Sequence, residues 1–151
     1  MEKTKRGYLC FMKIYIASKY IEHSEINNKI HQTLMNNGFD SFLPKAINID
    51  GTTMSEMTKI SEICYDSIDT TDVMIVVTPY GRSVSAEIGY FINEKRKNKN
   101  KTLILYTYSN INYDIESCEA MIVPYFDYII EAFNLGTERS LKQLIKFLQS
   151  I

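Results

Sequence analysis

DVMIVVTPYGRSVSAEIGYF, residues 72–91, shows most clearly what kind of domain this chain forms. Its apolar run VMIVV is typical of a strand that is buried on both faces of a sheet. A loop rich in Pro, Gly and Ser follows, and it leads to Glu87 at the start of an apolar helical pattern. Ligands of α/β sheets bind at the carboxyl ends of the strands. Glu87 is therefore the best candidate for a functional group in the sequence.

Strand-like and helix-like segments alternate on both sides of this stretch. Apolar strand patterns occur at 8–17, 39–44 and 102–108, and directly after Pro124. Helical spacing of apolar residues occurs at 22–37, at 56–70, from Glu87 to about Lys95, and from about Thr137 onward. This alternation predicts an α/β fold, in which a single domain over residues 1–151 forms a flavodoxin-like, doubly wound parallel sheet with helices on both faces.

The expected helices have recognisable ends and apolar sides. Ser24 and Thr137 are the expected N-caps of the first and last helices, and Gly38 is the expected C-terminal stop of the first. The apolar side of the second helix is expected to carry Met57, Ile60, Ile63 and Ile68, and that of the last helix Leu141, Leu144, Ile145 and Leu148. A polar loop is expected at 45–56, and the basic run KRKNKNK at 95–101 is interpreted as a solvated helix end rather than an anion-binding patch.

Composition and charge exclude several classes of function. The 151 residues carry a formal net charge of −1, which gives no support for non-specific nucleic-acid binding. Cys10, Cys64 and Cys118 are widely spaced and odd in number, as expected for reduced thiols rather than for a disulfide framework or a zinc site. The apolar segment 8–17 is too short to span a bilayer. We therefore expect a cytoplasmic protein with no metal, no cofactor, and no nucleic-acid or membrane partner.

Other candidate site residues surround Glu87 in the expected fold. Tyr15 lies near the carboxyl end of the first strand, where its hydroxyl could donate to Glu87 and orient it; a core aromatic with no such role is an equal alternative. The small residues of the loop would let a ligand approach the backbone, and Arg82 is either a contact for an anionic ligand or a solvated loop residue. The candidate substrate-binding residues in these two segments are Ser18, Gly81, Arg82, Ser83 and Ser85.

Four short motifs, in this order, resemble the nucleoside 2-deoxyribosyltransferase family, which includes nucleoside 5′-monophosphate N-glycosidases. They are KIYIAS at 13–18, TTDVMIVV at 70–77, SAEIGYF at 85–91 and EAMI at 119–122. Together they extend over most of the chain. The resemblance implies an enzyme that acts on a (deoxy)nucleoside or nucleotide.

The resemblance also implies roles for individual residues. Glu87 would attack the anomeric carbon and expel the base, and an acceptor base or water would then release the sugar from the glycosyl-enzyme ester. Tyr15 would orient Glu87. Glu119 would reach into the active site of a neighbouring subunit, with Met121 in the family's Met position, so a homodimer or a larger homo-oligomer is expected.

Two positions depart from the family's pattern. Gly81 stands where transferases carry an Asp that holds the sugar 5′-hydroxyl, and Cys64 stands where many members carry an acid directed at the leaving base. Some monophosphate hydrolases of the family place serines where phosphate binds, and this loop offers Ser83 and Ser85, but a carboxylate at Glu119 would repel a phosphate. These departures lead to the hypothesis that Glu119 replaces the missing Asp and that the substrate is a nucleoside.

Two other classes of function remain open at this point. One is a nucleotide-sensing or interaction module that uses the same scaffold without turnover. The other is a Toll/interleukin-receptor-like domain, which would use a glutamate on a nicotinamide nucleotide such as NAD. The choice between transfer and hydrolysis, and the identity of the base and sugar, also remain open.

Overall fold

One sheet of five parallel strands forms the centre of the computed structural model, which describes residues 11–44, 51–108 and 121–151. The strand order is β2-β1-β3-β4-β5, the order of a flavodoxin-like doubly wound sheet, so the predicted fold class is confirmed. In chain order the elements are β1 (Lys13–Ala17), α1 (Ser24–Asn36), β2 (Asp40–Phe42), α2 (Met54–Asp69), β3 (Val73–Val77), α3 (Arg82–Lys97), β4 (Thr102–Tyr108), η3 (Val123–Tyr125), β5 (Tyr128–Ala132) and α4 (Glu138–Leu148).

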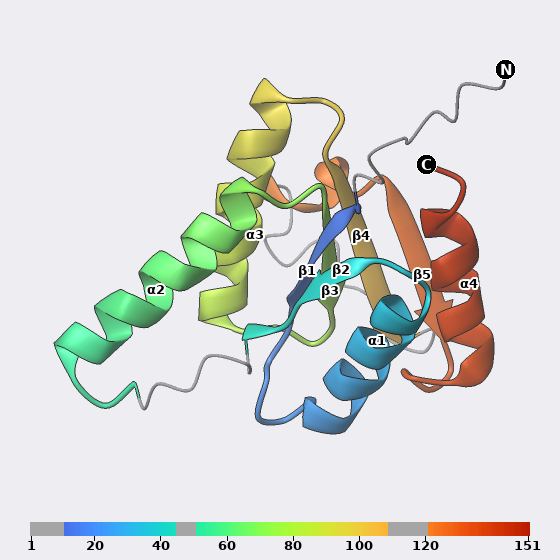
Figure 1. Cartoon of the computed structure of the whole chain (residues 1–151), viewed down its shortest axis with the longest axis horizontal. Helices are drawn as coiled ribbons and strands as arrows, with labels where there is room; N and C mark the ends of the chain where they lie inside the picture. The colour runs from blue at the N-terminus through green and yellow to red at the C-terminus, as the bar shows by residue number, and fades with distance from the viewer. Residues whose placement is uncertain (1–10, 45–50, 109–120) are drawn as a thin grey trace, which may run out of the picture.

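The helices cover both faces of the sheet, α1 and α4 on one side and α2 and α3 on the other (Figure 1). Successive side chains of a strand point to opposite faces, so β1 contributes to two cores. Ile14 and Ile16 pack with α1 and α4, whereas Tyr15 and Ala17 pack with the α3 side. All five residues of β3 are buried, as its unbroken apolar sequence predicts. No helix within the described ranges is long and apolar enough to cross a membrane.

The helix starts differ in part from those expected. The prediction of Ser24 as an N-cap is wrong, because α1 already begins there and the capping position, His23, makes no side-chain cap. The second helix begins at Met54, before the expected residue 56, because Thr53 and Glu56 form a capping box. Gly38 follows α1 with a φ of +82°, and Thr137 caps α4, both as predicted.

The expected apolar side of α2 is only partly buried. Cys64 and Ile68 are buried, whereas Met57 and Ile63 are 46% and 36% exposed. The first turns of α2 lie away from the sheet (Figure 1), which agrees with the exposure of Met57. Of the four residues expected on this side only Ile68 is buried, so helical spacing predicted the buried face of α2 only in part.

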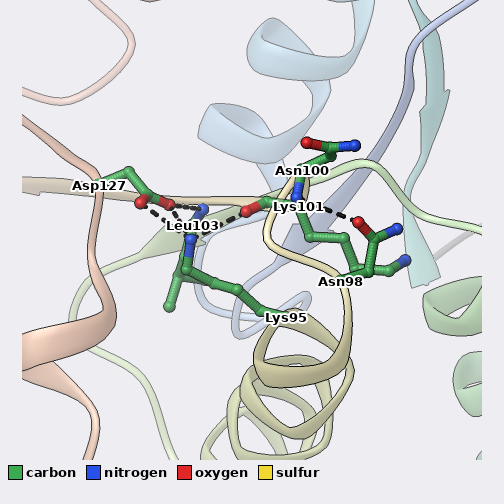
Figure 2. A network of polar contacts seen from close by, with 6 residues as sticks. All are labelled: Lys95, Asn98, Asn100, Lys101, Leu103 and Asp127. Atoms are coloured by element: carbon green, nitrogen blue, oxygen red, sulfur yellow. Dashed lines mark hydrogen bonds and ion pairs between the residues drawn. The ribbon is translucent and has the colours of Figure 1, made fainter.

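The end of α3 is fastened at the edge of the sheet opposite the carboxyl ends of the strands. Asp127 accepts hydrogen bonds from the backbone N–H of Leu103 at 2.7 Å and from Lys95 Nζ at 2.7 Å, and Lys95 also donates to the carbonyl of Lys101 (Figure 2). The basic run does not lie wholly outside the helix, since α3 extends to Lys97. Lys95, the first residue of the run, therefore has a structural role.

Some predictions are corrected or fall outside the described chain. The first strand is shorter than 8–17, because β1 begins at Lys13, and residues 8–10 are not among those described. The expected loop at 45–56 ends at Thr53, and its first part, 45–50, is also outside. Three further residues named above, Cys10, Cys118 and Glu119, are also outside the described ranges.

Candidate active site

The candidate site lies where β1 and β3 are neighbours at the carboxyl edge of the sheet. The order β2-β1-β3 means that the chain leaves β1 and β3 in different directions, which is the switch point at which doubly wound sheets bind ligands. Tyr15 on β1 is in register with Met74 on β3. The segment after β3 then forms α3, which carries Glu87.

Glu87 is held at the inner edge of α3. The helix begins at Arg82, so Glu87 lies in its second turn, and the expectation of a loop up to Glu87 is wrong. Val84 and Ile88 are buried against the sheet three residues before and one residue after Glu87. Helical geometry therefore directs Glu87 towards the side of the sheet that carries Tyr15.

Burial perturbs the acidity of both groups. Desolvation raises the pKa of Glu87 from its ordinary 4.5 to about 7, and the nearby Tyr15 hydroxyl acts in the opposite direction by favouring the carboxylate. Desolvation, followed by the charge of Glu87, raises the pKa of Tyr15 above its ordinary value. Glu87 thus titrates near neutral pH, where a carboxyl group can change its protonation state during a reaction.

Two buried oxygen atoms at this site lack a hydrogen-bond partner among the described residues. The Tyr15 hydroxyl and Glu87 Oε2 lie close enough to affect each other's pKa, yet neither makes a hydrogen bond of ordinary geometry with a described residue. Tyr15 is fully buried. Because buried polar atoms in proteins are nearly always hydrogen-bonded, two adjacent exceptions call for an explanation, and a catalytic role or a bound polar group such as water is one.

The raised pKa of Glu87 predicts a pH-dependent stability. The contribution of a carboxyl group whose pKa is higher in the folded than in the unfolded chain is fully present below about 4.5 and is lost as the pH rises through about 7. We expect the wild type to lose about 2–3 kcal/mol of unfolding free energy, relative to Glu87→Gln, between about pH 5 and pH 8. Urea unfolding of both proteins at the two pH values measures this difference.

The comparison of the wild type with Glu87→Gln also controls for other titrating groups. One of them is His23, because burial lowers its pKa. These groups are present in both proteins and cancel in the comparison. Parallel pH dependence of the wild type and Glu87→Gln would contradict a raised pKa at Glu87.

Cys64 is the third polar group near Tyr15 and Glu87. It is a buried free thiol on α2, and burial raises its pKa, so the thiol stays neutral. A neutral thiol here cannot supply the charge of the acid that the family resemblance places at this position. The sequence indicated Cys64 only as a departure from the family's pattern. Its closeness to Tyr15 and Glu87 depends on the packing of α2 and is seen only in the structure.

The residues at the start of α3 occupy different environments. Gly81 is the N-cap of the helix, and Ser85 donates a hydrogen bond to its carbonyl oxygen at 3.0 Å. Arg82 and Ser83 are exposed, and Arg82 forms no ion pair with a described residue. All three residues after Gly81 that were expected in a ligand-binding loop therefore lie in the first helical turn or just after it.

Ser18 and Met121 do not join this group. Ser18 is buried and its hydroxyl lies 3.3 Å from His23 Nδ1, so it is engaged in the segment that connects β1 to α1. Met121 is 79% exposed. Glu119, the residue expected to enter a neighbouring subunit, is outside the described residues.

Sequence reasoning missed Lys19, which lies across the start of α3. A β-carbon on Gly81 would be 3.4 Å from Lys19 Cε. Its position directly after Ser18, at the end of the first strand, was the available signal. A lysine in a connection is usually solvated, so this signal was not distinctive.

Other parts of the described chain show weaker evidence of a binding site than the surroundings of Glu87. A depression of about 510 Å³ lies over α1 and α4, on the opposite face of the sheet, and its charged lining residues Glu138, Lys142 and Lys146 are exposed. No group of three His, Cys, Asp or Glu side chains within the described ranges is placed to hold a metal ion.

Comparisons with known proteins show similarity in structure only. No protein-family model matches the chain, and no curated protein is significantly similar to it. The CMP N-glycosidase of Clostridium botulinum superposes with a TM-score of 0.58 at 16% identity, covering 91% of this chain and 98% of that chain. The 2-deoxyribosyltransferase of Bacillus psychrosaccharolyticus superposes with a TM-score of 0.63 at 19% identity, covering 81% and 88%.

The same fold also occurs in a protein that is not named as a glycosidase or a transferase. A pilus assembly-related protein of Burkholderia pseudomallei superposes with a TM-score of 0.52 at 13% identity, covering 93% of this chain and 90% of that chain. At these identities the comparisons show only that the chain shares its fold with these proteins. Function must be argued from the site.

Proposed function

We propose that this protein cleaves or transfers the N-glycosidic bond of a nucleoside or nucleotide, with Glu87 as the nucleophile. The observation that carries the proposal is a pair of neighbouring buried oxygens, Tyr15 Oη and Glu87 Oε2, at the switch point of the sheet, which make no hydrogen bond of ordinary geometry with a described residue. A carboxylate oxygen that is not fixed in a hydrogen bond can approach carbon, and the nearby Tyr15 hydroxyl, which favours the carboxylate form, would help to hold its orientation.

The proposed reaction has two steps. In the first, an oxygen of the Glu87 carboxylate forms a bond to C1′ of the sugar while the bond from C1′ to the base nitrogen breaks. The bonding electron pair leaves with the base, which takes up a proton, and a glycosyl ester of Glu87 remains. In the second step water, or an N–H nitrogen of another base, attacks C1′, the bond from C1′ to Glu87 breaks to release the carboxylate, and the attacking atom gives up one proton to solvent, which balances the proton taken up by the departing base.

Two of the structural neighbours support this class of reaction. They are named for cleavage of CMP and for transfer of 2-deoxyribose, and both reactions break a bond between a sugar and a base. The pilus assembly-related neighbour is the reason why the proposal depends on Tyr15 and Glu87 rather than on the fold.

Base release from a panel of substrates tests the proposal. The panel contains ribonucleosides, 2′-deoxyribonucleosides, their 5′-monophosphates and NAD, each with and without an acceptor base. The assays are run above about pH 8, because Glu87 is ionised there. We expect release of the base from at least one nucleoside or mononucleotide, and acceptor-dependent formation of a new nucleoside if the enzyme is a transferase.

Two other results would contradict the proposal. Release of nicotinamide from NAD alone would favour a Toll/interleukin-receptor-like activity. Saturable binding of a nucleotide without release of any base would favour a sensing module. The neutral Cys64 and the glycine at position 81, which leave both acids of the family's pattern absent, are the features that would then explain lost turnover.

A further inference from the structure

The ring of Tyr15 stacks on the ring of Phe42. Phe42 is the last residue of β2 and lies in register with Tyr15 on β1. The two ring centroids are 5.3 Å apart and the ring planes are inclined by 25°, which is the geometry of an offset stack. Both side chains pack in the apolar cluster between the sheet and α3. Phe42 therefore contacts the phenol that neighbours Glu87.

Few other contacts in the described chain can fix the plane of the Tyr15 ring. The hydroxyl makes no hydrogen bond of ordinary geometry with a described residue. On the other side of β1, Met74 of β3 is in register with Tyr15 and belongs to the same cluster. A methionine is flexible and adapts to its neighbour, whereas an aromatic ring is flat and rigid. Of the two side chains that flank Tyr15 in the sheet, Phe42 is thus the one that can set the plane of the ring.

The plane of a phenol determines where its hydroxyl can donate. Rotation about the bond between Cβ and Cγ leaves the phenol oxygen in place but turns the plane of the ring, and this torsion is a soft one. The O–H bond of a phenol prefers to lie in the ring plane, because a lone pair of the oxygen is conjugated with the ring. A turned ring would direct the proton of Tyr15 away from Glu87 even if the oxygen had not moved.

Two groups lie beside the Tyr15 hydroxyl. Glu87 is on α3, and Cys64 is on α2, one helical turn before Ile68, which packs in the same cluster as Tyr15. After desolvation, the charges of Glu87 and Cys64 raise the pKa of Tyr15, so both lie near its hydroxyl. Because they come from different helices, hydrogen bonds to them require different directions of the O–H bond. Only a proton directed at Glu87 stabilises the carboxylate and holds its orientation.

We propose that Phe42 is a positioning residue for the reaction: its stack on Tyr15 fixes the plane of the phenol, and with it the direction in which the hydroxyl donates to Glu87. The inference rests on the proposed function and adds a residue to it. Phe42 acts through Tyr15 and does not need to touch the substrate. It should therefore change the rate of the chemical step rather than the binding of the substrate.

Replacement of Phe42 with and without a ring tests the stack. Phe42→Leu keeps an apolar side chain but removes the flat partner. We expect its kcat to fall about tenfold with KM about unchanged, because the hydroxyl then donates to Glu87 only part of the time. Phe42→Tyr keeps a ring at the same place and should retain kcat within about twofold of the wild type. Equal losses in the two variants would overturn the inference.

A double-mutant cycle separates this role from general packing. Without the Tyr15 hydroxyl the plane of the ring no longer matters, so Phe42→Leu should not lower kcat further in a Tyr15→Phe background. A further loss of about tenfold in that background would overturn the inference. The matched control is Phe147→Leu, because Phe147 stacks on Tyr128 on the other face of the sheet, with centroids 3.9 Å apart. This control should keep the kcat of the wild type.

NMR titration of the glutamate side chains gives a readout that needs no turnover. Desolvation raises the pKa of Glu87 to about 7, and the Tyr15 hydroxyl opposes this rise. We expect the pKa to be higher in Phe42→Leu than in the wild type, and at most as high as in Tyr15→Phe. Phe42→Tyr should leave it unchanged. Thermal unfolding checks that the variants are folded, and Phe42→Met, which also lacks a ring, replaces Phe42→Leu if that variant does not fold. An unchanged pKa in a folded variant without the ring would overturn the inference.

Failure of the inference can be told apart from failure of the proposed function. If Phe42→Leu keeps the kcat of the wild type while Glu87→Gln is inactive, the inference falls and the proposed function stands. If no substrate releases its base, the proposed function fails and the titration decides alone. A pKa of Glu87 that depends on Phe42 only when the Tyr15 hydroxyl is present supports the inference, and any other dependence overturns it.

Discussion

Glu87→Gln is expected to lower kcat/KM of base release by at least about 10⁴-fold, because an amide cannot form the glycosyl ester. The substitution keeps the shape of the side chain and removes only its ability to ionise. It should also raise the unfolding free energy at alkaline pH, since a buried carboxylate costs more than a buried amide. Loss of activity without loss of stability would separate a chemical role from a structural one.

Glu94→Gln is the matched control for this variant. Glu94 lies on the same helix, is partly buried and pairs with Lys97 at 2.9 Å. Its replacement should leave kcat/KM unchanged.

Rapid quenching followed by mass measurement of the intact protein gives a direct test of the ester. The wild type should gain the mass of one sugar residue during turnover, and Glu87→Gln should not. If Glu87→Gln retained more than about a tenth of wild-type activity, Glu87 would not be the nucleophile.

Tyr15→Phe is expected to lower kcat about 100-fold without destabilising the protein. The hydroxyl that is removed is buried and makes no hydrogen bond of ordinary geometry with a described residue, so its loss should leave the unfolding free energy unchanged or raise it by about 1 kcal/mol. Loss of the hydroxyl also removes an influence that lowers the pKa of Glu87. The alkaline shift of the pH–rate profile is a readout that a purely structural role of Tyr15 would not produce.

Tyr106→Phe is a close control, because Tyr106 is equally buried but has partners. Its hydroxyl accepts a hydrogen bond from the backbone N–H of Gly136 at 2.7 Å and lies 2.5 Å from Ser140 Oγ. Tyr106→Phe should therefore lose about 1–3 kcal/mol of stability and keep its kcat. If Tyr15→Phe were destabilised to the same extent, the Tyr15 hydroxyl would be structural.

The elements that sequence patterns predicted well are those whose signal is local. The strand VMIVV, the turn at Gly38 and the Thr137 cap each depend on residues next to one another, and all three are present. The start of α3 was predicted less well. The Pro/Gly/Ser content of 78–85 is typical of a loop, but only its first part is one, because serines and an arginine are tolerated in a first helical turn.

Local patterns in this chain were enough to establish an alternating α/β fold and to single out Glu87, because side-chain period and turn chemistry are encoded within a few residues. They could not show that Tyr15, Cys64 and Glu87 are buried together, that the pKa of Glu87 is about 7, or that Lys19 crosses Gly81. Those properties arise from desolvation and from contacts between segments that are distant in the sequence. The folded sheet alone brings these segments together, by placing β1 beside β3.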